Sequence, residues 1–357
     1  MKIFKHLCLI CFSVLIILGC STKNAHISIT DKNKQVNDFS SIIEKTKDSI
    51  VFISSSINEN LAVNAGQNSI CSGAVINPEG HIITNYHCIH RQKYIRVYFW
   101  DDDNWVDYSV NIIGEDPLGD LALLEVNDKD TKTPFLSFAD NASVGEDVFA
   151  LGHPMGLSWS VTKGIISNNE RFARHPYIKA VQTDAAINKG NSGGPLLNMR
   201  GEIVAINALM VSRVQENAGV GVSIRGDIVK NSIEQMSKFG KYERPAIGVQ
   251  IMEIIDENSR VAIQKDHPNL RKDHIPNTFG LFVKQTKDVP EGLKPFDTII
   301  AVNDVMLNSG IELSDEIMKN YIGDWISLTV IRKRKYIKVE VKLKLFPVPI
   351  DSLYPKR

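Results

Sequence analysis

Three segments of this sequence hold the residue types of a nucleophile, a base and an orienting carboxylate. The string KGNSGGPL at 189–196 sets Ser192 among glycines, which allow a tight turn with an exposed hydroxyl and converging backbone N–H groups. His87 follows the apolar run 81–84, and Asp120 opens the apolar run 121–126. Taken singly, each residue has a plain structural interpretation: a glycine–serine turn, a structural or surface histidine, and a turn carboxylate.

Together the three residues describe a catalytic triad. A serine hydroxyl is a weak nucleophile until a base removes its proton, and the imidazole needs a carboxylate to fix its tautomer. The chain order His87, Asp120, Ser192 is that of chymotrypsin-like enzymes. The sequence therefore predicts acyl transfer without a metal or other cofactor. It contains no phosphate-binding loop of the type GxxxxGK, so no nucleotide dependence is expected.

The elements that must position these residues are mainly β. Short apolar or alternating runs are separated by turn residues, with NPEG at 77–80 as a hairpin turn, and this spacing predicts an all-β barrel or sandwich. A short helix at 41–49 and an amphipathic helix at 227–238 are expected, followed by a linker at 243–245 and a second unit at 246–346 with one helix around 313–321. Examples of these runs are 49–54, 74–76, 81–84, 94–100, 121–126, 148–151, 165–167, 203–207 and 219–224.

The N-terminus has the pattern of a secretory signal. Lys2 and Lys5 precede the apolar run 7–18, which is too short to span a bilayer comfortably. The ending ILGC at 17–20 resembles a bacterial lipobox, so we predict a signal peptide at 1–19, lipidation of Cys20 and a flexible tether at 20–40. An ordinary signal with a chance cysteine and a retained anchor helix are the alternatives. The expected location is the periplasmic side of the cell envelope, as a membrane lipoprotein.

The composition excludes some classes of protein. The 357 residues suggest two or three domains, and 41 basic against 41 acidic residues argue against nucleic-acid binding through bulk charge. The basic run at 332–335 is interpreted as the tip of a solvated hairpin rather than a nucleic-acid patch. The acidic run at 101–103 is interpreted as an exposed turn, with a calcium site as the alternative.

Cys71 and Cys88 are the two thiols left once the signal is removed and Cys20 is lipidated. The hairpin turn at 77–80 pairs the strands on either side of it and brings their outer ends together, near the separation that a disulfide requires. We therefore predict a disulfide between Cys71 and Cys88, with a buried reduced pair as the alternative.

At the level of whole motifs, the sequence resembles the HtrA (Deg) family of serine proteases over about residues 41–346. The matching motifs are TNYH at 84–87, DLAL at 120–123, GHPMG at 152–156, VTKGIIS at 161–167 and QTDAAINKGNSGGPL at 182–196. The resemblance implies a mainly β fold: two chymotrypsin-like six-stranded β-barrels at 41–240, followed by a PDZ domain (α+β) at 246–346. It places His87 and Asp120 in the first barrel and Ser192 in the second.

The resemblance also assigns roles around the triad. It implies an oxyanion hole made by the backbone N–H groups of Gly190 and Ser192, with Asn191 between them. Ala186 and Ile187 match the floor of the primary specificity pocket, where no carboxylate is present to pair with Lys or Arg. Small aliphatic residues before the cleaved bond are therefore expected. His153 stands where the family usually has Asn, and we expect it in a loop without an assigned role.

The second unit resembles a PDZ domain. Ala246-Ile247-Gly248-Val249 matches the loop that captures a peptide's C-terminal carboxylate beside an open strand edge. The segment GLKPFDTIIAVN at 292–303 resembles a family motif, with Phe296 in place of the usual glycine and Glu291 in place of a small residue. Both departures leave the fold intact and put the ligand preference in question. A packing domain without a ligand is the alternative.

These features predict an ATP-independent endopeptidase of the cell envelope that cuts misfolded or signalling proteins. The resemblance implies a homotrimer whose partners are unfolded or C-terminally exposed polypeptides, with no role for nucleic acid. The alternative is a PDZ-based binding or chaperone-like protein with little proteolytic activity.

Overall fold

The structure is a computed structural model that describes residues 39–58, 69–101, 104–127, 133–153, 159–172, 178–208, 219–284 and 289–354. Several parts of the chain discussed above lie outside these ranges: the predicted signal, Cys20, nearly all of the tether, Asp102, Asp103 and residues 154–156. None of the helices in the described ranges combines the length and apolar character that a membrane crossing requires.

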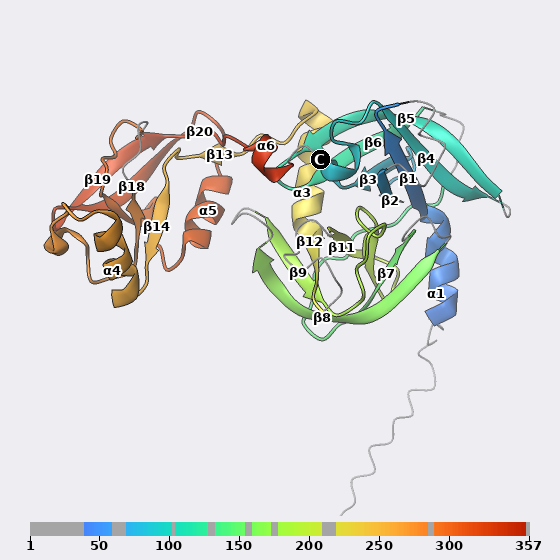
Figure 1. Ribbon diagram of the computed structural model, residues 1–357, viewed down its shortest axis with the longest axis horizontal. Helices are drawn as coiled ribbons and strands as arrows, with labels where there is room; N and C mark the ends of the chain where they lie inside the picture. Colours follow the sequence, from blue (N-terminus) through green and yellow to red (C-terminus); the bar gives the residue numbers. More distant parts are fainter. Residues whose placement is uncertain are drawn as a thin grey trace, which may run out of the picture. The chain divides into compact units, whose positions relative to one another are not determined.

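Six antiparallel strands close the first barrel in the order β1-β2-β3-β6-β5-β4 (Figure 1). Its interior is filled by β-branched and leucine side chains such as Ile53, Ile82 and Leu124, all fully buried. Gly80 has a φ of 80° and closes the predicted turn between β2 and β3. The strands are β1 (Ile50–Ser56), β2 (Ser69–Val75), β3 (His81–Thr84), β4 (Tyr94–Asp101), β5 (Asn104–Asp116) and β6 (Leu121–Val126).

Six further strands close the second barrel in the order β10-β11-β12-β9-β8-β7. Two closed barrels confirm the predicted fold class, and each predicted strand of this region overlaps an observed one. Three observed strands are not among the runs named from the sequence: β5, many of whose residues are exposed, and the short β9 and β10. The strands are β7 (Asp147–Gly152), β8 (Ser160–Phe172), β9 (Lys179–Thr183), β10 (Pro195–Asn198), β11 (Ile203–Asn207) and β12 (Gly221–Arg225).

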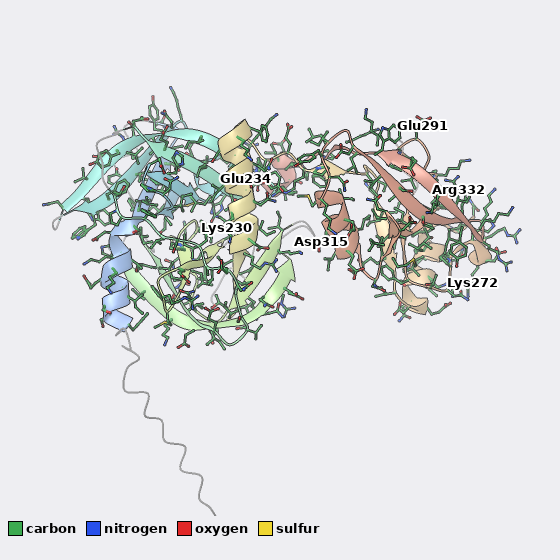
Figure 2. The ribbon with its side chains drawn as sticks, turned by 180° about the vertical axis from the view of Figure 1, so that it is seen from behind. Lys230, Glu234, Lys272, Glu291, Asp315 and Arg332 are labelled. Atoms are coloured by element: carbon green, nitrogen blue, oxygen red, sulfur yellow. A yellow bond between two sulfur atoms is a disulfide. The ribbon has the colours of Figure 1, made fainter. Side chains whose placement is uncertain are left out.

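The predicted amphipathic helix is confirmed as α3 (Gly226–Phe239). It buries Val229 and Met236 against the barrels, while Lys230 and Glu234 lie on its exposed face (Figure 2). The helix ends at Gly240, whose left-handed φ of 72° caps the last turn. At the start of the described chain, α1 (Phe39–Thr46) and the 3₁₀ turn η1 (Lys47–Ser49) cover the predicted 41–49 helix.

The second unit is a sheet in the order β14-β15-β16-β18-β19, with β17 paired to β16. It carries two helices, so the prediction of one helix is wrong. The missed helix, α4, begins at a capping box between Asp256 and Ser259, but it buries only Ile263 and so lacks a clear amphipathic pattern. The elements are β13 (Pro245–Ala246), β14 (Ile251–Ile254), α4 (Glu257–Asp266), η5 (Lys272–His274), β15 (Gly280–Val283), β16 (Thr298–Val302), β17 (Val305–Met306), α5 (Gly310–Met318), β18 (Trp325–Arg332), β19 (Lys335–Lys342), β20 (Lys344–Leu345) and α6 (Ile350–Leu353).

Two residues of this unit, Phe296 and Arg332, depart from the expected pattern, and their contacts explain both departures. Phe296 adopts a φ of 72°, the conformation that a glycine would take without strain. Its ring stacks on Phe282 with centroids 5.9 Å apart, and this packing offsets the strain. The 332–335 run is a hairpin tip as predicted, but Arg332 is only partly exposed (Figure 2), and its guanidinium bonds both oxygens of the buried Asp297 at 2.7 Å.

A buried ion pair ties the linker to the first barrel. The two terminal guanidinium nitrogens of Arg244 bond the carboxylate of Asp116 at 2.5 and 2.7 Å, and both side chains are almost fully buried. The same carboxylate accepts hydrogen bonds from the Ser232 hydroxyl of α3 and from the backbone N–H of Gly119. One carboxylate therefore joins the end of β5, the turn at 117–120, α3 and the linker.

A disulfide joins β2 to α2 (Tyr86–Ile89), the single helical turn that follows β3. The sulfurs of Cys71 and Cys88 are bonded, and their Cα atoms lie 6.1 Å apart. Within the described ranges, these two cysteines and His87 are the one group with the spacing of metal ligands. Because both sulfurs are engaged in the disulfide, we assign no metal there.

We expect Arg244→Met to lower the free energy of unfolding by about 3–5 kcal/mol, because it leaves the Asp116 carboxylate as a buried, uncompensated charge. Urea denaturation followed by circular dichroism at fixed protein concentration measures the change. The exposed pair of Glu234 and Lys238 on α3 supplies the control, since Lys238→Met should leave the midpoint within error. An Arg244→Met midpoint equal to that of the wild type would contradict the role assigned to this pair.

The disulfide predicts no free thiol in a chain that begins at residue 21, when it is denatured without reductant and titrated. Two free thiols would establish the reduced pair instead. A Cys71→Ala/Cys88→Ala variant should lose roughly 3 kcal/mol of stability, because the bond closes a loop with a sequence separation of 17.

Candidate active site

His87 and Asp120 meet through two hydrogen bonds. His87 Nδ1 lies 2.8 Å from Oδ2 of Asp120, and the backbone N–H of His87 donates to Oδ1 at 2.9 Å. The side chains are 10% and 2% exposed, so the pair is shielded from water while the imidazole keeps one open edge. These two bonds fix the orientation of the carboxylate group. The bond to Nδ1 also selects the tautomer of His87 that carries its hydrogen on Nδ1.

Asp120 is held in a backbone conformation that few non-glycine residues adopt. Its φ is 54°, directly before β6. The buried Asn85 side chain donates to the Asp120 carbonyl at 2.9 Å, and Asp116 holds the preceding N–H of Gly119. A Cβ on Gly119 would lie 2.2 Å from Asp116 Oδ2, so only glycine allows this close turn. The turn that presents the carboxylate is therefore fixed at both ends.

Ser192 lies on the turn before β10, where the second barrel meets the first. It is 4% exposed, and its carbonyl accepts a hydrogen bond from the Ser72 backbone N–H at 2.8 Å. The next residue, Gly193, has a φ of 82°, and a Cβ there would lie 2.3 Å from both the Ser72 carbonyl and the Thr84 hydroxyl. The glycine after the serine is therefore required by the close approach of the two barrels.

Ser72 fastens the serine turn to the first barrel, a role that the sequence analysis did not identify. Its hydroxyl donates to the Gly190 carbonyl at 2.7 Å and accepts from the backbone N–H of His153 at 3.0 Å. Thr84 donates to the Ser72 carbonyl at 2.8 Å. The only sequence signal for Ser72 is its position next to Cys71, in a strand that leads toward the triad.

The residues expected to form the oxyanion hole lie on one tight turn. Gly190 has a φ of 108°, and Asn191, which is 1% exposed, closes the turn by donating its N–H to the Asn188 carbonyl at 3.0 Å. The Gly190 carbonyl on this turn accepts the hydrogen bond from the Ser72 hydroxyl, which fastens the turn to the first barrel.

Ala186 and Ile187 lie beside this turn, where the Asn191 side chain donates to the Ala186 carbonyl at 3.4 Å. The Ala186 carbonyl accepts a hydrogen bond from the Thr162 hydroxyl at 2.8 Å. Ile187 is 4% exposed and packs against Gly221 at the start of β12, where a Cβ would lie 2.7 Å from its Cγ1. Ile187 is part of the apolar core of the second barrel, whereas the Ala186 carbonyl is hydrogen-bonded by polar side chains.

His153 lies in a loop, as expected, but the loop is buried at this residue. It directly follows β7, is fully buried, and its ring lies 4.7 Å from Trp159 and 5.1 Å from Trp105, centroid to centroid. Phe52 completes the aromatic cluster at 5.8 Å. The hydrogen bond from the His153 backbone N–H to the Ser72 hydroxyl keeps this segment buried. The spacing of apolar residues along the chain did not indicate this burial.

A second histidine, His90, follows the end of α2. Burial, with a smaller effect from Glu115, raises the pKa of Tyr86 to about 12, so its hydroxyl stays protonated and donates to His90 Nδ1 at 2.7 Å. Burial and then the charge of Arg91 lower the pKa of His90. Both shifts favour the uncharged forms of Tyr86 and His90.

In the PDZ-like unit, the predicted carboxylate loop precedes the edge strand. Ala246 and Ile247 are buried, Gly248 has a φ of 74°, and β14 is the terminal strand of the described sheet. The structure adds Glu253, whose Oε1 accepts from the Gly310 N–H at 2.7 Å and so links β14 to the start of α5. The edge that a peptide would join is therefore next to α5.

Comparison with known proteins identifies both regions. Residues 71–206 match the trypsin-like peptidase domain, and residues 245–343 match the PDZ domain. The serine protease Do-like HtrA of Bacillus subtilis is 31% identical over 325 residues, which cover 84% of this chain and 68% of that protein. The periplasmic serine endoprotease DegP of Salmonella typhimurium is 31% identical over 281 residues, covering 76% of this chain and 56% of that protein.

A probable periplasmic DegP-like endoprotease of Rickettsia prowazekii is 30% identical over 333 residues, covering 90% of this chain and 61% of that protein. The chain thus spans 56% and 61% of the lengths of these two DegP relatives.

Solved structures share the fold. The HtrA-type protease AlgW with a decapeptide has a TM-score of 0.72 at 23% identity, covering 87% of this chain and 100% of that one. The serine endoprotease from Yersinia pestis has a TM-score of 0.67 at 26% identity, covering 87% and 98%. From the motifs, the two barrels and these matches it follows that the chain belongs to the HtrA family of serine proteases.

Proposed function

We propose that this protein is a serine endopeptidase of the cell envelope that works through an acyl-enzyme. The observation that carries the proposal is the 2.8 Å contact of His87 with the buried Asp120, at the junction of two barrels where the Ser192 turn is fastened by Ser72. Family membership and the periplasmic naming of the relatives support it.

In the proposed mechanism Ser192 Oγ attacks the carbonyl carbon of the peptide while His87 Nε2 takes the hydroxyl proton. Asp120 keeps Nδ1 protonated and stabilises the imidazolium. The negative oxygen of the tetrahedral intermediate accepts hydrogen bonds from the N–H groups of Gly190 and Ser192. Removing one such donor typically costs about 3 kcal/mol of transition-state stabilisation. The imidazolium then protonates the leaving amine, and water hydrolyses the acyl-enzyme by the same route.

The PDZ unit is proposed to bind an extended peptide along the edge of β14, with the peptide's terminal carboxylate at the 246–249 loop. The related AlgW structure contains a decapeptide, which supports a peptide as the ligand class. Misfolded or signalling proteins with accessible C-termini are the proposed substrates. Calorimetric titration would contradict this mode if amidating the C-terminus of a bound peptide left its affinity unchanged.

We further propose that the protein is anchored by lipid on Cys20 and assembles as a homotrimer. The lipobox-like ending of the signal supports the first, and family membership supports the second. Palmitate labelling that persists in Cys20→Ala would exclude the anchor. A monomeric mass by light scattering, for a chain that begins at residue 21, would exclude the trimer.

Ser192→Ala and His87→Ala should each abolish casein turnover while leaving the circular dichroism spectrum unchanged, because the two residues act as one unit. Asp120→Asn should lower kcat by about 10⁴-fold, because the amide supports the wrong tautomer of His87. Wild-type rates in any of the three would remove the triad. Peptide binding without Ser192-dependent turnover in the wild type would favour the binding or chaperone-like alternative.

Cleavage should occur after Val, Ile, Ala or Leu, because Ala186 and Ile187 offer an apolar pocket floor without a carboxylate. Mass-spectrometric mapping of cleavage sites in a denatured protein substrate measures this preference, with the Ser192→Ala protein as background. A profile dominated by Lys or Arg would contradict the assignment of these two residues.

A further inference from the structure

The end of the described chain returns to the first barrel after the PDZ unit. The strand β20 pairs with β13, so the segments that enter and leave this unit run side by side. Phe346 then donates its N–H to the Arg244 carbonyl at 2.8 Å, and the short helix α6 leads to Tyr354. Beside α6, Asp351 pairs with Arg91 at 2.6 Å, and the chain's red end lies against the first barrel (Figure 1).

Tyr354 reaches the carboxylate of the triad. Its hydroxyl lies 2.6 Å from the Pro117 carbonyl and 3.1 Å from Oδ1 of Asp120. The side chain is 4% exposed, with its ring 5.0 Å from Tyr86 and 5.3 Å from His90, centroid to centroid. A residue separated from Asp120 by 234 positions is therefore part of the immediate surroundings of that carboxylate.

We propose that Tyr354 is a positioning residue of the triad, which holds Asp120 through its Oδ1 so that Oδ2 stays directed at His87. This inference rests on the proposed function. Oδ1 receives two donors, the His87 backbone N–H and the Tyr354 hydroxyl, and Oδ2 faces His87 Nδ1. Three points of attachment leave the carboxylate no free rotation about its Cβ–Cγ bond.

The hydroxyl also balances the charge of the carboxylate. Its single hydrogen is shared between the Pro117 carbonyl and Asp120 Oδ1, so its positive end lies beside the negative group. A hydrogen bond to an ionised acceptor is stronger than one between neutral groups. The other titratable or charged side chains around this site are Tyr86, His87, His90, Arg91, Glu115 and Asp351.

The change Tyr354→Phe distinguishes a purely structural role of Tyr354 from a positioning role. The ring of Tyr354 packs on Tyr86 and His90 whether or not it carries a hydroxyl, so packing alone survives the change Tyr354→Phe. Only the contact with Asp120 is lost in that variant. The hydroxyl and the ring can therefore be tested separately.

The experiment compares the wild type, Tyr354→Phe and the matched control Tyr336→Phe, which removes a hydroxyl from an exposed tyrosine of β19. We expect Tyr354→Phe to lower kcat by about fivefold to tenfold with KM unchanged, because the substrate does not touch this residue. The acid limb of its kcat/KM profile should move to higher pH, since the uncompensated carboxylate favours the imidazolium. The control should match the wild type in all three respects.

Thermal denaturation and the rate of Ser192 labelling by a fluorophosphonate complete the test. Slower labelling of a folded Tyr354→Phe supports the proposal. Wild-type kcat and pH profile in Tyr354→Phe would overturn it and leave the proposed function standing. A wild type that shows neither Ser192-dependent turnover nor labelling would remove both. Should Tyr354→Phe prove unfolded, a chain ending at Leu345 replaces it, and full wild-type kcat in that chain would also overturn the proposal.

Discussion

The buried carboxylate of Asp116 is the constraint on which the arrangement of this protein depends. It accepts hydrogen bonds from Arg244, Ser232 and Gly119, so one ionised group fixes the linker, α3 and the turn at 117–120. A charge with side-chain exposure of 0% is tolerable only with such partners. Asp116 holds the turn that ends at Asp120, whose φ is 54°. The buried ion pair four residues before Asp120 therefore stabilises the strained backbone of the triad carboxylate.

The sequence was sufficient for features that rest on local chemistry. Strands such as 81–84 and 121–126 were predicted because β-branched and leucine residues alternate or run together between turn residues, and α3 because its apolar residues share one face. The triad was predicted because nucleophile, base and carboxylate each need a specific residue type. Where apolar patterning is weak, as in β5 and α4, the elements were missed because tertiary contacts and a capping box stabilise them.

The contacts that the sequence did not reveal are long-range. Ser72, Asn85 and Tyr354 reach the triad across many residues, and their residue types are unremarkable at those positions. His153 lies in a loop, as expected, but the sequence did not reveal that it is buried among aromatic rings from three separate segments. No pattern of one segment encodes such a neighbourhood, because it forms only when both barrels have closed.

The two chain segments that flank the PDZ unit meet the same turn of the first barrel. Arg244, just before β13, holds Asp116 at its start, and Tyr354, shortly after β20, contacts Asp120 at its end. The strands β13 and β20 are themselves paired, so the two flanking segments are held next to each other. Coupling between distant sites requires a contiguous element whose arrangement both sites can bias. The turn at 117–120 meets the structural part of that requirement. With Asp116 before it, it contacts both segments that flank the PDZ unit, and it contains the carboxylate that is hydrogen-bonded to the imidazole of His87.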